Sequence, residues 1–173
     1  KSTYNLYGTQ IVGDRMLLAS GVSFADALSA APFAHYARAS QYAGAFLPYG
    51  GFETTGTVIG GTNTIPKLEN EDHRIAGDNR YETSAKLADI IAGELKQDVQ
   101  VAYIADGTNY PDALTAAPDV TDKTGVILLT QPDVLNAHAK RFIEEHEIKK
   151  IYVIGGENSV SKQVENELNE LIK

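Results

Sequence analysis

Two segments of this 173-residue chain are near copies of one another. Residues 21–32 read GVSFADALSAAP and residues 107–118 read GTNYPDALTAAP, so seven of the twelve positions are identical. A second pair follows at the matching place, VIGGTNTIPK at 58–67 and VIGGENSVSK at 153–162. A duplicated unit that is long and has no short internal period indicates a duplicated folded module. We therefore expect two related lobes, and a function carried by a surface built from more than one of them.

The composition excludes several classes of protein. A hydrophobic fraction of 43% is enough to bury a core, as one domain or two half-size lobes. The net charge of −8 disfavours non-specific nucleic-acid binding, which needs a basic face. The absence of cysteine argues against a disulfide framework and a cysteine-ligated metal. No apolar run approaches the roughly 18 residues of a membrane span, and the start at Lys1 is interpreted as a processed or trimmed end.

The second copy has the pattern of a complete α/β unit. Asn79 followed by Glu82 resembles a capping box at the start of a helix over 80–95. Further helices are predicted from near 112, over 133–146 and over 161–171, and nearly continuous apolar strands over 99–105, 126–130 and 151–154. Strands of that kind, alternating with helices, are typical of a parallel sheet covered on both faces. The predicted fold class is therefore α/β, in tandem small three-layer units of flavodoxin- or Toprim-like type.

The first copy is abbreviated. Pro32 and Gly60 are 28 positions apart, whereas Pro118 and Gly155 are 37 apart, and a Gly-rich loop at 48–56 replaces a helix. A polar segment at 68–73 is predicted to be a flexible linker. We accordingly divide the chain into a partial first repeat, 1–73, and a complete second repeat, 74–173.

Asp26 and Asp112 occupy the same place in the two copies, where a strand passes through a Gly turn into a helix. The favoured interpretation is structural, because a carboxylate at a helix N-terminus is stabilised by unpaired backbone N–H groups and the helix dipole. The alternative is a catalytic or metal-binding carboxylate at the carboxyl end of a parallel sheet. Asp106 would be its partner in the second copy, but Ser20 stands at that place in the first. This difference favours the structural interpretation.

Two glycine pairs and two prolines also recur at matching places. Gly60-Gly61 and Gly155-Gly156 lie between a strand and a helix, where glycine permits a tight turn and exposed N–H groups could hold an anion. No dinucleotide or P-loop fingerprint accompanies them. Pro32 and Pro118 are predicted to kink or end the helices that contain them.

The basic and histidine side chains give weaker signals. Arg74 and Arg80 could pair with Asp78 and Glu82 at the surface, or could recognise an anionic ligand through the fork geometry of arginine. The four histidines show no metal-ligand spacing, and no nucleophile elbow is present.

Four motifs in order carry a resemblance to a known family. They are RIAGDNRYETS at 74–84, DGTNYPDALTAAP at 106–118, GVILLT at 125–130 and IYVIGGENSVS at 151–161. Together they closely resemble the cell wall binding repeat type 2 family of Gram-positive surface proteins. The match covers one full repeat and parts of another.

The resemblance implies a non-catalytic module, without cofactor or metal, that retains a secreted surface protein on the cell wall by holding an anionic polymer such as a teichoic acid. Family repeats usually assemble in threes, so a third repeat or a homo-oligomer is implied. The family's Ile-Leu-Leu motif, implicated in polymer anchoring, corresponds to Ile127, Leu128 and Leu129. From the residues alone, this triplet is an inner strand explained by burial. Candidate ligand contacts are then Arg74, Arg80, Ile127, Leu128, Leu129, Gly155 and Gly156.

Two readings from other classes remain open. One is an α/β nucleotide- or phosphate-binding domain, or a metal-dependent enzyme, that uses Asp112 and the Gly-Gly turns. The other is an oligomerisation scaffold of a surface protein. An acidic chain can still hold an anionic polymer, because exposed charges more than about 10 Å away are largely screened at ~0.1 M salt.

Overall fold

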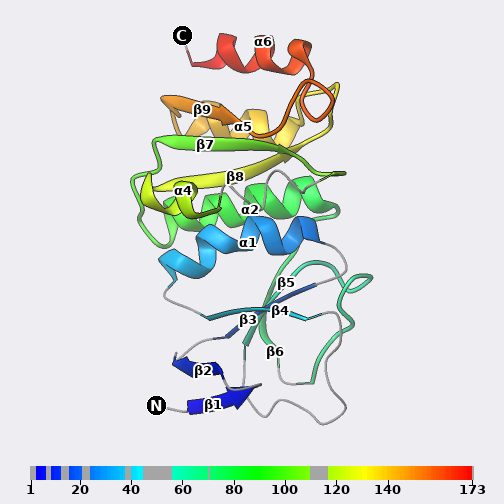
Figure 1. Cartoon of the computed structure of the whole chain (residues 1–173), viewed down its shortest axis with the longest axis vertical. Coiled ribbons are helices and arrows are strands. Elements are labelled where there is room, and N and C mark those ends of the chain that lie inside the picture. Colours follow the sequence, from blue (N-terminus) through cyan, green and yellow to red (C-terminus); the bar gives the residue numbers. More distant parts are fainter. Residues whose placement is uncertain are drawn as a thin grey trace.

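The computed structural model describes residues 3–6, 9–12, 16–20, 24–37, 40–44, 56–69, 71–109 and 117–172. Asp112 and the expected loop residues 48–55 lie outside these ranges. The described elements stack along one long axis, from an N-terminal hairpin at one end to a C-terminal helix at the other (Figure 1).

The first lobe contains a four-stranded parallel sheet in the order β4-β3-β5-β6. Its strands are β3 (Met16–Ser20), β4 (Ser40–Gly44), β5 (Gly56–Ile59) and β6 (Glu71–Ile75). Helix α1 (Phe24–Tyr36) connects β3 to β4. A separate antiparallel hairpin, β1 (Thr3–Leu6) with β2 (Thr9–Val12), precedes the sheet and was not expected from the sequence.

The second lobe contains a three-stranded parallel sheet in the order β8-β7-β9. Its strands are β7 (Val101–Asp106), β8 (Gly125–Thr130) and β9 (Lys150–Val153). Its helices are α2 (Arg80–Gly93), α4 (Ala117–Asp122), α5 (Ala137–Glu145) and α6 (Lys162–Leu171). The α/β class and the parallel sheets are confirmed, because β7 and β8 are buried along their whole length, as near-continuous apolar strands require.

Local signals set several helix ends. Asn79 Oδ1 accepts hydrogen bonds from Tyr81 N and Glu82 N, both at 3.0 Å, which confirms the predicted cap of α2. The Glu82 carboxylate accepts from the backbone N–H of Asp78 at 2.6 Å rather than from that of the cap residue. The start of α5 was predicted too early: Thr130 Oγ1 accepts from Asn136 N and donates to Val134 O, both at 2.9 Å. These bonds fix a turn before the helix, and Asn136 becomes its N-cap.

A further expectation for the first lobe was wrong in part. Residues 71–73 of the segment expected as a linker belong to β6, which pairs with β5 in the register Val58 with Arg74 and Ile59 with Ile75. The expected domain boundary at 73/74 therefore falls inside a strand of the first sheet. The polar sequence of β6 resembles a linker because β6 is an edge strand, which has one side open to solvent. Of the two effects predicted for Pro32, an ending of the helix is ruled out, because α1 continues to Tyr36.

Helices α1 and α2 lie between the two sheets and pack on each other, so that one apolar cluster includes residues of both lobes (Figure 1). They also cover the outer edge of β8. Ser84 Oγ of α2 accepts a hydrogen bond from Leu129 N at 3.1 Å, and the Tyr36 hydroxyl of α1 donates to Gly125 O at 3.2 Å. Side chains from two helices thus satisfy polar groups that an edge strand leaves unpaired. The lobes are joined through β8.

Candidate functional site

Motif residues from both copies meet at the carboxyl ends of β5 and β7. Asp26 lies in the first turn of α1 against Gly60, where an added Cβ would be 2.5 Å from Asp26 Oδ2. Arg74 Nη1 donates to the Gly60 carbonyl oxygen at 2.8 Å. Arg80, the first residue of α2, donates from Nη1 to the carbonyl oxygen of Gly107, just after β7. We call these five residues the junction cluster; open α/β sheets bind ligands at this end of their strands.

The guanidinium of Arg74 is hydrogen-bonded to the turn after β5. Its Nη1 donates to Gly60 O and, at 3.0 Å, to Ile65 O, while Nη2 donates to Pro66 O at 3.3 Å. Nε and Nη2 also donate to the two carboxylate oxygens of Glu71, at 3.2 and 2.5 Å. This bond is the main reason why the pKa of Glu71 lies below its usual value. A guanidinium has five N–H donors, and these five bonds occupy them, so the turn and Glu71 leave Arg74 no donor for a ligand.

Arg80 is the exposed member of the junction cluster. Among the residues that the structure describes, its guanidinium donates to one acceptor, Gly107 O. A Cβ added to Gly107 would lie 3.2 Å from Arg80 Cδ and 2.7 Å from the ring of Tyr81, so the absence of a side chain there lets Arg80 cross the strand end. Of the two acidic partners considered from the sequence, Glu82 is engaged elsewhere, because it pairs with Lys86 at 3.0 Å.

Asp26 is 5% exposed. Burial raises the pKa of its carboxyl group, and the charge of Arg80 offsets part of that increase. A raised folded-state pKa means that the folded protein binds the proton more tightly than the unfolded chain does. The contribution of Asp26 to stability is therefore unfavourable at neutral pH and improves as the pH falls through the raised pKa toward the ordinary value.

We expect Asp26→Asn to be more stable than the wild type at pH 7, since the amide imitates the protonated carboxyl group without charge. The difference in free energy of unfolding should shrink as the pH is lowered toward 4. Urea denaturation of both proteins at pH 7, 5.5 and 4 measures this, and the other carboxylates cancel in the difference. A gap independent of pH, or an asparagine variant that is less stable at pH 7, would contradict the assignment.

The Ile127–Leu129 triplet lies inside the molecule. The exposed fractions of Ile127, Leu128 and Leu129 are 1%, 0% and 0%. Ile127 and Leu129 pack with Leu28 of α1 on one face of the sheet, and Leu128 joins the core shared by the two lobes on the other face. Their side chains have no surface to offer a ligand in this arrangement, so a role in direct contact stays a prediction that the burial disfavours.

The two Gly-Gly turns have the same geometry. Gly60 and Gly155 have φ of 111° and 96°, in the region that favours glycine. The carbonyl oxygen of Gly61 accepts from Thr64 N and Ile65 N, both at 3.0 Å, and that of Gly156 accepts from the matching residues Ser159 and Val160, at 2.8 and 3.1 Å. Gly155 and Gly156 are exposed, whereas Gly60 is buried. Pro118 lies in α4, and Asp112 lies outside the described residues.

Sequence reasoning missed a cationic and aromatic patch on the second sheet. Tyr152 stacks on Tyr103 with ring centroids 4.9 Å apart, and Nζ of Lys123 and Lys150 lie 4.6 and 4.7 Å from the centroid of the Tyr152 ring. Asp119 accepts from the Tyr103 hydroxyl and from Lys123, both at 2.5 Å. Burial, followed by this hydrogen bond, raises the pKa of Tyr103 to about 12. Tyr152 lies in the fourth motif, but its pairing with Tyr103 is not visible in the sequence, because only the β7–β9 register brings the two tyrosines together.

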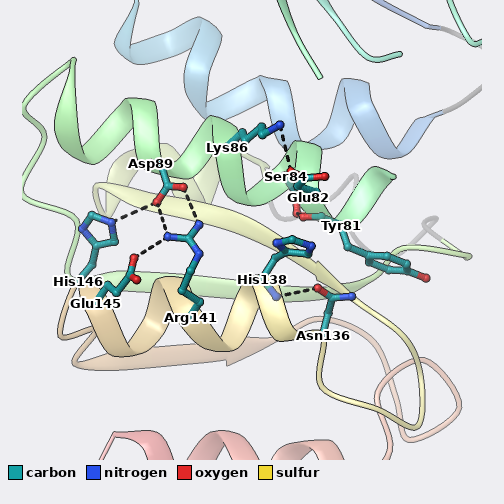
Figure 2. A network of polar contacts seen from close by, with 10 residues as sticks. All are labelled: Tyr81, Glu82, Ser84, Lys86, Asp89, Asn136, His138, Arg141, Glu145 and His146. Carbon is teal, nitrogen blue, oxygen red and sulfur yellow. Dashed lines mark hydrogen bonds and ion pairs between the residues drawn. The ribbon is translucent and has the colours of Figure 1, made fainter. Parts of the chain in front are cut away.

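A second polar network fastens α2 to α5 (Figure 2). The Asp89 carboxylate accepts from Arg141 Nη2 at 2.7 Å and lies 3.3 Å from His146 Nε2, while Arg141 Nη1 donates to Glu145 at 2.5 Å. The His146 ring also packs at a tilt against Phe142, with centroids 4.2 Å apart. The network holds helix to helix and lies apart from the junction cluster. Within the described ranges, no group of three or more metal-ligating side chains occurs, and no helix is long and apolar enough to cross a membrane.

Comparison with known proteins places these features in a family. Residues 74–165, just over half of the chain, match the family described as Cell wall binding domain 2 (CWB2). The chain belongs to the CWB2 family. This match confirms the resemblance drawn from the four motifs, and it makes the chain a cell wall binding protein by family.

Among curated proteins of Bacillus subtilis (strain 168), the chain is similar to the N-acetylmuramoyl-L-alanine amidase LytC, with 31% identity over 115 residues. It is also similar to the amidase enhancer, with 29% identity over 167 residues. These alignments cover 64% and 90% of this chain but 22% and 23% of the relatives, so the chain spans less than a quarter of either protein.

Two solved structures share the fold. Cwp6 from Clostridium difficile superposes with a TM-score of 0.76 at 22% identity, covering 91% of this chain and 27% of that one. Cwp8 from the same organism gives a TM-score of 0.69 at 20% identity, covering 91% of this chain and 29% of that one. The fold, with two sheets joined through helices, is therefore that of CWB2 proteins.

Proposed function

We propose that this chain is a non-catalytic anchoring module that retains a secreted surface protein on the cell wall by binding an anionic wall polymer non-covalently. Family membership supports wall binding. The observation that supports an anionic ligand is the exposed guanidinium of Arg80 at the carboxyl ends of the strands, beside the joint between the lobes. A planar guanidinium matches the oxygens of phosphate or carboxylate groups along such a polymer.

The local charge at this place differs from the net charge of the chain. Arg80 opens helix α2, so the positive end of the helix dipole adds to the guanidinium charge. The acidic side chain in that turn, Glu82, forms an ion pair with Lys86 at 3.0 Å and accepts a hydrogen bond from the N–H of Asp78. The electrostatic potential near Arg80 is therefore set by these nearby groups more than by the net charge of −8, because distant exposed charges are screened.

The two arginines that the sequence named together as candidate ligand contacts have different roles in this proposal. Arg74 holds the turn after β5, and Arg80 is the one placed to meet the polymer. The buried Ile127–Leu129 triplet would act indirectly, by fixing the positions of α1 and α2, both of which contact β8.

Arg80→Ala is expected to weaken retention on purified cell walls by about 10- to 100-fold, because one charge-assisted contact contributes about 1.5–3 kcal/mol. Arg80→Lys should retain part of the binding, since it keeps the charge and loses the fork. Co-sedimentation with wall preparations at low and at 0.3 M salt measures the effect, and wall material stripped of its anionic glycan should bind none of the variants.

Lys140→Ala is the matched control, because Lys140 is an exposed cation on α5 and its removal changes the net charge by the same amount. It should leave retention unchanged. Equal retention of wild type and Arg80→Ala would remove Arg80 from the site, and undiminished binding to stripped walls would remove the anionic polymer as the ligand.

A further inference from the structure

The stacked tyrosines of the second sheet have no equivalent in the first lobe. The duplicated motifs align Leu17 with Tyr103 and Thr57 with Tyr152. Leu17 faces Thr57 in the register of β3 with β5, as Tyr103 faces Tyr152 in the register of β7 with β9. The same place in the sheet therefore holds an aliphatic and a hydroxyl side chain in one lobe, and two stacked rings in the other. Because the first lobe folds without them, the tyrosines are not a requirement of the fold.

The two rings hold a pair of lysine side chains in place. Tyr103 is 2% exposed, and its hydroxyl donates to Asp119 Oδ2 at 2.5 Å. Asp119 in turn accepts from Lys123 Nζ with both carboxylate oxygens, at 2.5 and 2.6 Å. The ring of Tyr152 is partly exposed, with Nζ of Lys123 at 4.6 Å and Nζ of Lys150 at 4.7 Å from its centroid. Hydrogen bonding from Lys150, and then from Lys123, holds the pKa of the Tyr152 hydroxyl below its usual value.

The charges at this place do not balance. We call Tyr103, Asp119, Lys123, Lys150 and Tyr152 the tyrosine–lysine patch. Lys123 forms an ion pair with Asp119, whereas in the described part of the chain no carboxylate lies within 4.0 Å of Lys150 Nζ. Two ammonium groups and one carboxylate leave one positive charge, with two like charges held at one ring. A single negatively charged group between the two lysines would interact favourably with both.

The patch lies at the opposite end of the second sheet from Arg80. Lys150 begins β9 and is paired with Val101, the first residue of β7, whereas Arg80 contacts Gly107 just beyond the last residue of β7. A rise of about 3.3 Å per residue along β7 separates these two places by about 20 Å. A polymer that carries an anionic group on each repeating unit can reach both places with one chain, which a single small anion cannot do.

We propose that the tyrosine–lysine patch is a second contact site for the wall polymer, in which Lys123 and Lys150 together bind one phosphodiester or carboxylate group. This inference rests on the proposed function and extends the polymer contact to both ends of the second sheet. Tyr152 keeps the two ammonium groups together, and Tyr103 and Asp119 are positioning residues that do not touch the polymer. Two contacts with one polymer chain raise the apparent affinity, because the second binding event is intramolecular.

The test is co-sedimentation with purified walls of a variant that combines Lys123→Gln with Lys150→Gln. We expect retention at low salt to fall by about fivefold, less than for Arg80→Ala, because exposed lysine pairs are weak and lysine lacks the fork of arginine. Lys140→Gln combined with Lys149→Gln is the matched control, since it removes two charges from exposed positions of the same lobe. The control should bind as the wild type does. Equal retention of the two double variants would overturn the proposal.

A second variant tests whether the rings arrange the lysines. Tyr103→Leu combined with Tyr152→Thr installs the pair found in the first lobe, in a register that is known to accept it. It keeps both lysines and the net charge, yet retention should again fall by about fivefold, because the ammonium groups are no longer held together. Circular dichroism checks that the variant is folded. Wild-type retention by the folded variant would overturn the role of the rings.

Walls stripped of their anionic glycan separate this inference from the proposed function. If the wild type sediments equally with stripped and intact walls, the anionic polymer is not the ligand, and both the proposed function and the second contact site are wrong. If the wild type requires intact walls while the Lys123 and Lys150 double variant binds as its control does, only the second contact site is wrong. Arg80 then remains the place where the polymer binds.

Discussion

Replacing Leu128 with alanine will lower the free energy of unfolding by about 2–5 kcal/mol, the usual cost of emptying a fully buried leucine site. Leu128 is inaccessible to solvent and belongs to the apolar cluster that both lobes share. The loss should therefore destabilise both lobes. For a chain of this size, it corresponds to a fall in Tm of about 10 °C. Thermal unfolding followed by circular dichroism measures it.

The matched control is Val134→Ala, just beyond the end of β8, where the side chain is 60% exposed. It should change stability by no more than about 0.5 kcal/mol. The decisive comparison is wall retention at a temperature at which Leu128→Ala is still fully folded. We expect near-normal retention there, because the side chain is not at the surface. A loss of binding by the fully folded variant would show that the triplet contacts the polymer, contrary to its burial.

The features that sequence predicted well are those fixed by local chemistry. The helix that begins after Asn79 needed only a cap and an apolar periodicity. The parallel strands β7 and β8 needed only continuous apolar runs between helices. The duplicated VIGG motif gave two turns with the same hydrogen bonds and the same sign of φ at Gly60 and Gly155. In each case the determining residues lie within a few positions of one another.

The features that sequence could not give depend on partners far along the chain. Nothing local marks the polar segment at 71–75 as a strand, because its reason to be extended is β5 beside it. Arg74 and Arg80 looked equivalent, and only the bonds to Gly60, Ile65 and Pro66 show that one of them is committed to a turn. Tyr36, which covers the edge of β8, lies 89 positions before its hydrogen-bond acceptor Gly125.

Gly60→Ala will be among the most destabilising single-methyl additions in the chain, at about 3 kcal/mol. Its φ of 111° is a conformation that only glycine adopts without strain, which costs about 1–3 kcal/mol for another residue. The new Cβ would also lie 2.5 Å from Asp26 Oδ2 and 3.2 Å from its Cγ. Because Asp26 is buried, the carboxylate has little room to withdraw. Urea denaturation should show a lower midpoint with an unchanged slope.

Gly61→Ala is the matched control, because it adds the same methyl group at the neighbouring glycine. No atom lies within 4 Å of a Cβ built at Gly61, and its φ is not positive. It should leave stability within about 0.5 kcal/mol of the wild type. Combining Gly60→Ala with Asp26→Ala separates the two causes of the loss. Relief of the clash should make the double variant more stable than the sum of the single changes predicts, and what remains is the backbone strain. Strict additivity would mean that Asp26 does not confine the turn, and the junction cluster would then lose the contact that ties α1 to β5.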